Sequence, residues 1–411
     1  MKILCILAVY LFQSDSTTIT SNSLLSTAFQ DPQVKYQESQ LEYLNNNPLT
    51  TPLIDEVQFR TETRDFDWDR QQYALRVSPN ALGQKKYSKA YYQNMLEEFD
   101  ARWEEALNQA LKERYLLLVK LVKTQQYLTA QQRRKLVLED RLTVLKKNAN
   151  AIDFDYQELV DAENDYQKAL LDIIDLEQDA ESIQVEVQTM LNTGDAISIN
   201  DSELIDVAYI VEQLDQLPKS TDSLNVNLLR NQYNLRQVEL EFLEEQAQSK
   251  NVLDFVQAEY RNDEREGVIE DFRIGVGLNL PVTKASQARL NRLSLERLEE
   301  ENDLQTFKVN LQQELDNIQS KLRVLLKKHE TISSFIEESD TENSLQKYLS
   351  IEGISPLTLL GVQESIIDNE LRLYGLENDI FQAYVSLLDK MGLLVARPLT
   401  NYFDPSGSSI E

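Results

Sequence analysis

Residues 272–280 read Phe-Arg-Ile-Gly-Val-Gly-Leu-Asn-Leu, a strict alternation of apolar residues with polar or small ones. Successive side chains of a β-strand point to opposite faces of a sheet, so this stretch predicts a strand with one apolar face. We expect that face to meet either a protein core or lipid. Its candidate members are Phe272, Ile274, Val276, Leu278 and Leu280.

A second alternating segment lies about 200 residues earlier, which indicates an internal repeat. Tyr73, Leu75 and Val77 form its apolar set and are further candidates for a lipid-facing surface. A partner strand precedes each segment, at 57–61 in the first half and at 255–261 in the second. The sequence therefore predicts two strand pairs, at 55–79 and at 255–282.

Long helices follow both strand pairs. Residues 84–147 contain no glycine or proline, so a helix can run through them unbroken. Apolar residues recur there at spacings of three and four, and the same frame returns about 200 residues later, which predicts coiled-coil-like packing. The two matching sets are Leu107, Leu111, Tyr115, Leu118 and Val122, and then Phe307, Leu311, Leu315, Ile318 and Leu322.

These patterns divide the chain into a signal segment, two structural repeats and a tail. The first repeat, 17–222, is expected to contain short helices, strand pair 55–79, long helix 84–147, return helix 155–192 and linker helix 202–217. The second repeat, 223–396, is expected to contain helix 224–250, strand pair 255–282, long helix 284–330, helix 334–352 and return helix 356–391. Residues 397–411 form the C-terminal tail.

The first 16 residues have the features of an export signal. Lys2 precedes the apolar run 3–12, and Ser14-Asp15-Ser16 offers a small-residue site for cleavage after Ser16. The alternative is an amphipathic or buried N-terminal helix. Cys5, the only cysteine, lies inside the apolar run, so the mature chain would form no disulfide. No other stretch approaches the roughly 18–20 apolar residues of a membrane helix, so any crossing must use strands.

Composition and the absence of known catalytic motifs exclude several classes of function. The formal net charge of −28 argues against nucleic-acid binding, which needs a basic surface. No glycine-rich phosphate loop, metal-ligand cluster or nucleophile arrangement is present, so we predict no catalytic, cofactor-binding or metal-binding residues, no cofactor and no enzymatic activity. His329, the sole histidine, lies among charged residues and is expected at a solvated surface position.

Two turns between long helices carry the remaining candidates. Asn148-Ala149-Asn150 is expected to end one helix, and Gly353-Ile354-Ser355-Pro356 to stop a helix and cap the next. Acidic residues beside these turns suggest rings that select cations or gate the tip; the alternative is that acids simply favour helix N-termini and solvated ends. The candidate tip or gate residues are Asp153, Asp155, Glu158, Gly353 and Ser355. Trp68, Tyr73 and Phe272 are candidates for an interfacial aromatic girdle, or else packing residues.

The order of elements, a strand pair, a very long helix, a tight turn and a returning helix, occurs twice. Together with the turn sequence of residues 348–392 (YLSIEGISPLTLLGVQESIIDNELRLYGLENDIFQAYVSLLDKMG), it resembles the TolC-type outer-membrane efflux protein family over about residues 25–395. The resemblance implies a homotrimer in the outer membrane of a Gram-negative cell. Twelve strands would form a β-barrel continuous with a periplasmic α-helical tunnel.

The same resemblance implies a passive export duct of an efflux or type I secretion system, with a periplasmic adaptor protein and an inner-membrane pump as partners. An oligomer is also required physically, because four strands cannot close a barrel and open sheet edges are not tolerated in lipid. The alternative is a periplasmic coiled-coil scaffold that binds partner helices without forming a channel.

Overall fold

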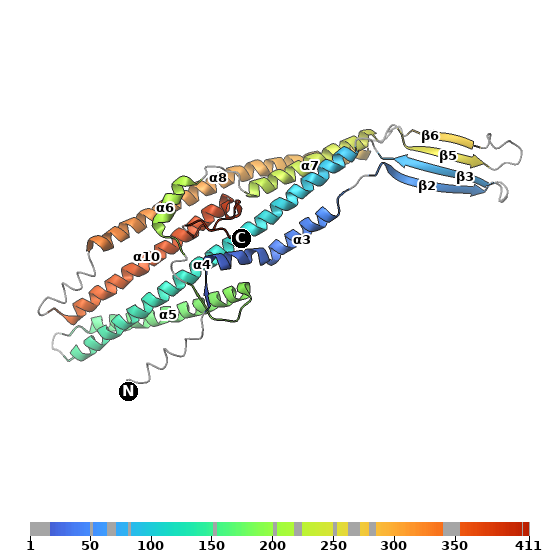
Figure 1. Cartoon of the computed structure of the whole chain (residues 1–411). Coiled ribbons are helices and arrows are strands. Elements are labelled where there is room, and N and C mark those ends of the chain that lie inside the picture. Colours follow the sequence, from blue (N-terminus) through green and yellow to red (C-terminus); the bar gives the residue numbers. More distant parts are fainter. Residues whose placement is uncertain are drawn as a thin grey trace. The chain divides into compact units, whose positions relative to one another are not determined.

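The computed structural model describes residues 17–49, 52–63, 71–80, 84–150, 154–199, 204–217, 224–249, 253–261, 272–278, 285–339, 354–404 and 406–410. The described chain is mainly helical with a small antiparallel sheet, as the sequence predicts (Figure 1). Contacts divide it into two compact units, each built from both repeats. Unit 1 is Met1–Lys35, Ala106–Ser223 and Leu311–Glu411, and unit 2 is Tyr36–Glu105 and Leu224–Asn310.

Unit 2 contains the four-stranded sheet, in the order β2-β3-β5-β6 with every neighbouring pair antiparallel. The strands are β2 (Ile54–Thr63), β3 (Gln71–Pro79), β5 (Phe255–Arg261) and β6 (Phe272–Gly277). The central pairing joins the two repeats, since β3 belongs to the first and β5 to the second. Figure 1 shows the four strands side by side.

Unit 2 also holds α7 (Leu224–Ser249), most of α3 (Pro32–Asn46) and the first parts of α4 and α8. Leu240 and Leu243 of α7 pack with Leu293 of α8 in a small buried cluster. The Tyr92 hydroxyl donates to the Leu44 carbonyl and so fastens α4 to the end of α3. Apolar packing between helices therefore stabilises this unit, whereas one face of its sheet is exposed.

Unit 1 is a bundle of long helices. It contains the greater part of α4 (Gln84–Asn148), all of α5 (Tyr156–Leu191) and α10 (Pro356–Lys390), and the last part of α8 (Ala285–Ser339). The predicted seam on α4 is buried: Leu107, Leu111, Tyr115, Leu118 and Val122 are each at most 1% exposed. Such burial supplies most of the stability of a long helix in water.

Short elements complete unit 1. β1 (Thr17–Ile19) pairs in parallel with β4 (Ile197–Ile199), and α2 (Ser21–Ser26) leads into the 3-10 turn η2 (Thr27–Gln30). The predicted tail is a packed hairpin that follows η5 (Leu393–Val395). Phe403, 1% exposed, makes edge contacts with Tyr115 and Phe381.

Two predicted helix boundaries are wrong. The linker helix α6 is Val207–Gln216 and does not begin at 202, because the Asp206 side chain accepts from the Ala208 N–H and caps the helix there. The expected break between 330 and 334 is absent, since α8 runs through it to Ser339. The Thr331 hydroxyl donates a hydrogen bond to the Lys327 carbonyl within the helix. This polar stretch contains no glycine or proline and therefore does not interrupt α8.

None of the described helices is both long enough and apolar enough to cross a membrane.

Candidate membrane-facing sheet and helix turns

The register of the sheet places the alternating residues of all four strands in rows. One face carries three rows of mostly apolar side chains. A valine row joins Val57, Val77, Val256 and Val276; a middle row joins Phe59, Leu75, Ala258 and Ile274; an aromatic row joins Thr61, Tyr73, Tyr260 and Phe272. The second strand of each hairpin, β3 in the first half of the chain and β6 in the second, thus has the same order of apolar residues.

This apolar face is open. The exposed fraction of its large apolar residues reaches 74% at Ile274 and is 36% at Tyr260, and Val77 is half-buried. Leu278, directly after β6 and in the same alternation, is 65% exposed. Soluble monomers rarely expose contiguous apolar surface on this scale, and such patches mark contact with a partner or a membrane. No described helix covers it, contrary to what a hairpin buried against helices requires.

The opposite face is polar and internally bonded. Nε and Nη2 of Arg76 donate to Oε1 of Gln257 at 3.3 and 3.2 Å, and the Arg261 Nε lies 2.7 Å from Oε1 of Glu259. The Arg76 guanidinium also stacks 3.7 Å from the centroid of Phe255. Glu259 is paired across the strands with Arg273. Charges and amides on one face with an apolar opposite face make the sheet amphipathic.

Glycine shapes the polar face at one point. A Cβ on Gly277 would lie 2.3 Å from Cε1 of Phe255, so only glycine lets that ring lie across β6. A Cβ on Gly275 would have Cβ of Gln257 as its nearest neighbour, at 3.9 Å, which is an ordinary contact. A side chain is therefore tolerated at Gly275 and excluded at Gly277.

Both described turn caps use the side chains that the sequence indicates. Oδ1 of Asp155 accepts from the backbone N–H of Gln157 at 2.9 Å and caps α5. Oγ of Ser355 accepts from the Leu357 N–H at 3.3 Å and caps α10. These bonds explain Asp155 and Ser355 as helix caps. Asp153 and Gly353 lie outside the described residues, as do Trp68 and Leu280.

Glu158 belongs to an ion-pair network that joins three helices. Arg141 of α4 contacts Glu158 of α5 at 3.4 Å and Glu364 of α10 at 3.3 Å. Arg134, one heptad earlier, contacts Glu364 at 3.6 Å and Asp368 at 3.4 Å. The network therefore connects α4 and α5, which flank the first turn, to α10, which follows the second. The sequence analysis did not identify Arg134 or Arg141 as functional residues. Their heptad spacing is the only local sign that they share one face of α4, and charged residues are common throughout the chain.

Solved structures share this architecture. VceC, an outer membrane protein of Vibrio cholerae, superposes with a TM-score of 0.61 at 11% identity, over 90% of this chain and 96% of VceC. The open state of the MtrE outer membrane channel of Neisseria gonorrhoeae gives 0.62 at 12% identity, over 91% and 89%. CusC, described with transmembrane channel formation, gives 0.60 at 12% identity, over 93% and 95%.

The chain has the TolC-type outer-membrane channel fold. The predicted mainly helical fold with a small antiparallel sheet is thus confirmed across nearly the whole chain, while the trimer and the closed barrel stay predictions. At the level of sequence, no family profile and no curated protein matches the chain. At such low identity the likeness establishes architecture, and function has to be argued from the residues.

His329 is not at a solvated surface, and the prediction that placed it there is wrong. Its side chain is 18% exposed, and Nε2 lies 3.4 Å from Oε1 of Glu377 on α10. The reason is positional: His329 comes one heptad after the buried Leu322 and so shares its face of α8. The Lys123 ammonium of α4, 5% exposed, donates to the other oxygen of Glu377. One carboxylate thus joins α4, α8 and α10.

Opposing effects set the ionisation of Glu377. Burial raises its pKa, but the hydrogen bond from His329 and the charge of Lys123 outweigh burial and hold the pKa below its usual value. The carboxylate is therefore charged at neutral pH and serves as an electrostatic bridge. Among the described residues no three His, Cys, Asp or Glu side chains are grouped in a way that would hold a metal ion.

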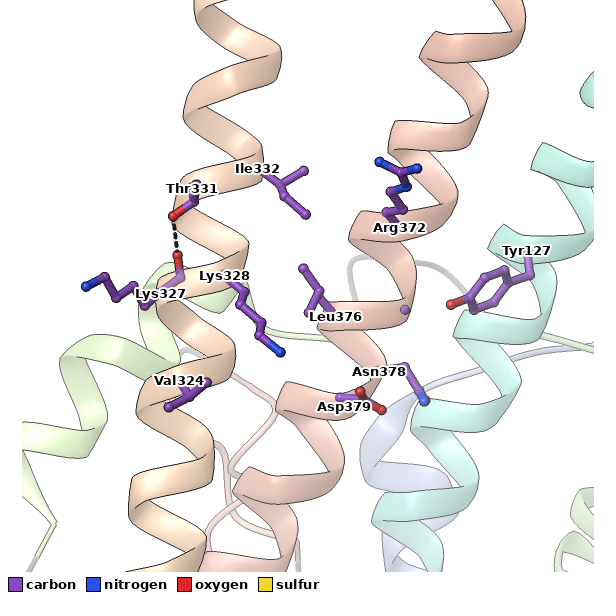
Figure 2. A pocket seen from close by; sticks show the side chains of 11 residues that line it. Tyr127, Val324, Lys327, Lys328, Thr331, Ile332, Arg372, Leu376, Asn378 and Asp379 are labelled. Atoms are coloured by element: carbon purple, nitrogen blue, oxygen red, sulfur yellow. Dashed lines mark hydrogen bonds between the residues drawn. The ribbon is translucent and has the colours of Figure 1, made fainter.

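An open cavity of about 770 Å³ lies beside this bridge, lined by residues of α8 and α10 and by Tyr127 of α4. Figure 2 shows Ile332 of α8 and Leu376 of α10 pointing toward each other across it. Lys328 points toward α10, whereas Lys327 points to the other side of α8. Lys327, Lys328, Thr331, Arg372 and Asp379 supply the polar part of its lining.

Proposed function

We propose that this chain is the subunit of a passive export channel in the outer membrane, with no catalytic role. The observation that carries the proposal is the amphipathic sheet: one face exposes ordered apolar rows, and the other holds a bonded polar network. In a membrane barrel, residues alternate between the lipid and a polar interior in this way. Tyr73, Leu75, Val77, Phe272, Ile274, Val276 and Leu278 would face lipid.

Strand topology supports closure by several identical copies. In the order β2-β3-β5-β6 the two outer strands run in opposite directions, because each neighbour is antiparallel. The β6 strand of one copy can therefore pair antiparallel with β2 of the next, and the ring closes without an edge. Three copies give the twelve strands of the family pattern. β2 and β3, with 10 and 9 residues, match the roughly 9–11 residues that span a bilayer.

The helix turns would form the periplasmic end of the duct, where an adaptor protein and an inner-membrane pump engage it. Arg141 would hold this end closed, because it ties α5 and α10 to α4 beside both turns. Arg141→Ala is expected to enlarge single-channel conductance at least twofold in a planar bilayer. Lys146→Ala, which removes the more exposed pair with Glu163, is the matched control and should leave conductance unchanged.

Fractionation and mass test the proposal against a periplasmic scaffold. The protein should remain in the outer membrane after washing with carbonate and high salt. In mild detergent, with detergent mass subtracted, the particle should weigh three chains. A protein released by the wash, or a monomer in detergent, would contradict the channel. A cysteine at Ser355 should crosslink to the adaptor, whereas one at Thr63, at the end of β2, should be labelled from outside the cell.

A further inference from the structure

The polar face of the sheet has a charge balance unlike that of the whole chain. Acidic residues outnumber basic ones by 69 to 41 in the sequence. The strand register nevertheless places four arginines and three glutamates on this face. They are Arg60, Arg76, Arg261 and Arg273, and Glu56, Glu62 and Glu259. The polar face is therefore much richer in cations than the chain as a whole.

Two of the four arginines are neutralised by neighbouring acids. Nε of Arg261 lies 2.7 Å from Oε1 of Glu259, and both residues belong to β5. Nη1 of Arg60 lies 3.9 Å from Oε1 of Glu62, again on one strand. The third acid, Glu56, lies near the start of β2 in a row that holds no arginine. Each pair adds no net charge to the face.

Arg76 and Arg273 are the uncompensated cations. Neither side chain forms an ion pair with another residue in the described part of the chain. Glu259 lies opposite Arg273 in the strand register, but its carboxylate is already bonded to Arg261 and, at 3.3 Å, to Nε2 of Gln257. Arginine stays protonated at every physiological pH. Each chain therefore presents two permanent positive charges here, in adjacent rows of the sheet.

Arg76 is fixed by two neighbours. Its guanidinium stacks 3.7 Å from the centroid of the Phe255 ring, and its Nε and Nη2 donate to Oε1 of Gln257. A guanidinium has five N–H groups, so about three remain for another acceptor. Gly275, the next residue of the same row, is exposed and adds no side chain that would shield them. A planar cation held in this way suits the oxygens of a carboxylate, sulfate or phosphate.

We propose that Arg76 and Arg273 make the sheet section of the duct favour anionic solutes, which carry carboxylate, sulfate or phosphate groups. The inference rests on the proposed function, because it requires the polar face to line the lumen of a closed ring. A barrel of twelve strands, about 4.8 Å apart and tilted by about 40°, has a radius of about 12 Å. The Debye length is about 10 Å at about 0.1 M salt, so the field of the arginines extends across the lumen.

Charged thiol reagents measure the potential at the sheet itself. Gly275→Cys, in a Cys5→Ser background, lies in the row of Arg76, and the space beside Gln257 accepts its side chain. An anionic methanethiosulfonate should modify this cysteine about fivefold faster than a cationic one, after each rate is divided by that for a free thiol. Adding Arg76→Gln should at least halve this ratio of rates. Adding Arg76→Lys, which keeps the charge, should preserve it.

Reversal potentials across a salt gradient measure permeation through the assembled channel. Arg76→Gln combined with Arg273→Gln should lower the ratio of chloride to potassium permeability at least twofold at about 0.1 M salt or below. The acids beside the helix turns belong to unit 1 and are the same in every variant, so they do not affect the comparison. Glu259→Gln combined with Arg261→Gln is the matched control: it removes a neutral pair from the same face and should leave the ratio unchanged.

The failure of this inference and the failure of the proposed function give different results. A conducting channel whose permeability ratio is the same with and without Arg76 and Arg273 would overturn the anion preference and leave the channel standing. Equal normalised rates of the two reagents at Gly275→Cys, or a ratio of rates unaffected by Arg76→Gln, would do the same. A protein that forms no channel in bilayers would overturn the proposed function, and this inference with it.

Discussion

Tyr73 of β3 pairs directly with Tyr260 of β5, and both side chains are exposed on the same face of the sheet. Phe272 of β6 extends this row to a third strand, while four valines form a parallel row nearer the helices. Tyrosine favours the boundary between lipid and water, because its ring is apolar and its hydroxyl is polar. The two rows therefore mark an apolar band with an aromatic border.

Val276→Lys is expected to impair assembly. The substitution places a charge in the valine row, and in a bilayer this costs roughly 2–4 kcal/mol per copy near the midplane. The yield of trimer in the outer membrane should fall at least tenfold, measured on unheated gels.

Gly275→Lys is the matched control, one residue away on the polar face. The space beside Gln257 accepts its Cβ, so assembly should proceed. Gly277→Lys is unsuitable as a control because its Cβ would collide with Phe255. Equal loss for both lysine variants would mean that the sheet does not separate lipid from lumen.

Lys123→Met should lower the free energy of unfolding by about 3 kcal/mol, because it leaves the half-buried Glu377 carboxylate without its main counter-charge. Arg133→Met, on the same helix, removes a pair with Glu370 that is more exposed and should cost less than about 1 kcal/mol. Denaturant unfolding followed by circular dichroism measures both. A similar loss in the two variants would contradict the importance of burial at Lys123.

Acid should weaken the Glu377 bridge. The pKa of Glu377 in the folded protein lies below its usual value of 4.5, so the bridge contributes fully above that value and is lost as pH falls below it. Glu377→Gln should therefore be less stable than the parent at pH 7, with a smaller further loss between about pH 5 and pH 3. Parallel melting curves across that range would refute the linkage.

Phe403→Ala should destabilise unit 1 by about 3–5 kcal/mol, because the ring is buried against Tyr115 and Phe381. Tyr43→Ala, at a side chain that is 66% exposed, should change stability by less than about 0.5 kcal/mol. Thermal melting of both variants measures the difference. A neutral Phe403→Ala would mean that the C-terminal hairpin is dispensable.

Periodicity explains what the sequence could predict. The strands around Val77 and Val276 and the seam through Tyr115 repeat over many residues, so their side-chain patterns are strong even without an alignment. The pairings of β2 with β3 and of β5 with β6 can also be predicted, because the two strands of each hairpin are close in the sequence. The caps at Asp155 and Ser355 are similarly local, since a cap needs only the backbone two or three residues on.

Contacts between distant segments were not predictable. β1 and β4 have three residues each, too few for a periodic signal, and the buried Asn401 bonds to Ser21 and Asn22 from the other end of the chain. Arg141 and its acidic partners look like ordinary surface charges until three helices bring them together. The charged neighbours of His329 suggest a surface position, although its heptad position places it on the buried side of α8.

Accessibility to a lipid-dissolved quencher tests the central claim, that the apolar face of the sheet meets lipid. Single cysteines at 256, 274 and 276 on one face, and at 257, 273 and 275 on the other, would carry the same fluorophore in the Cys5→Ser protein reconstituted in bilayers. The account predicts strong quenching at the first three positions and little at the second three. Equal quenching of both sets, or the reverse order, would contradict it.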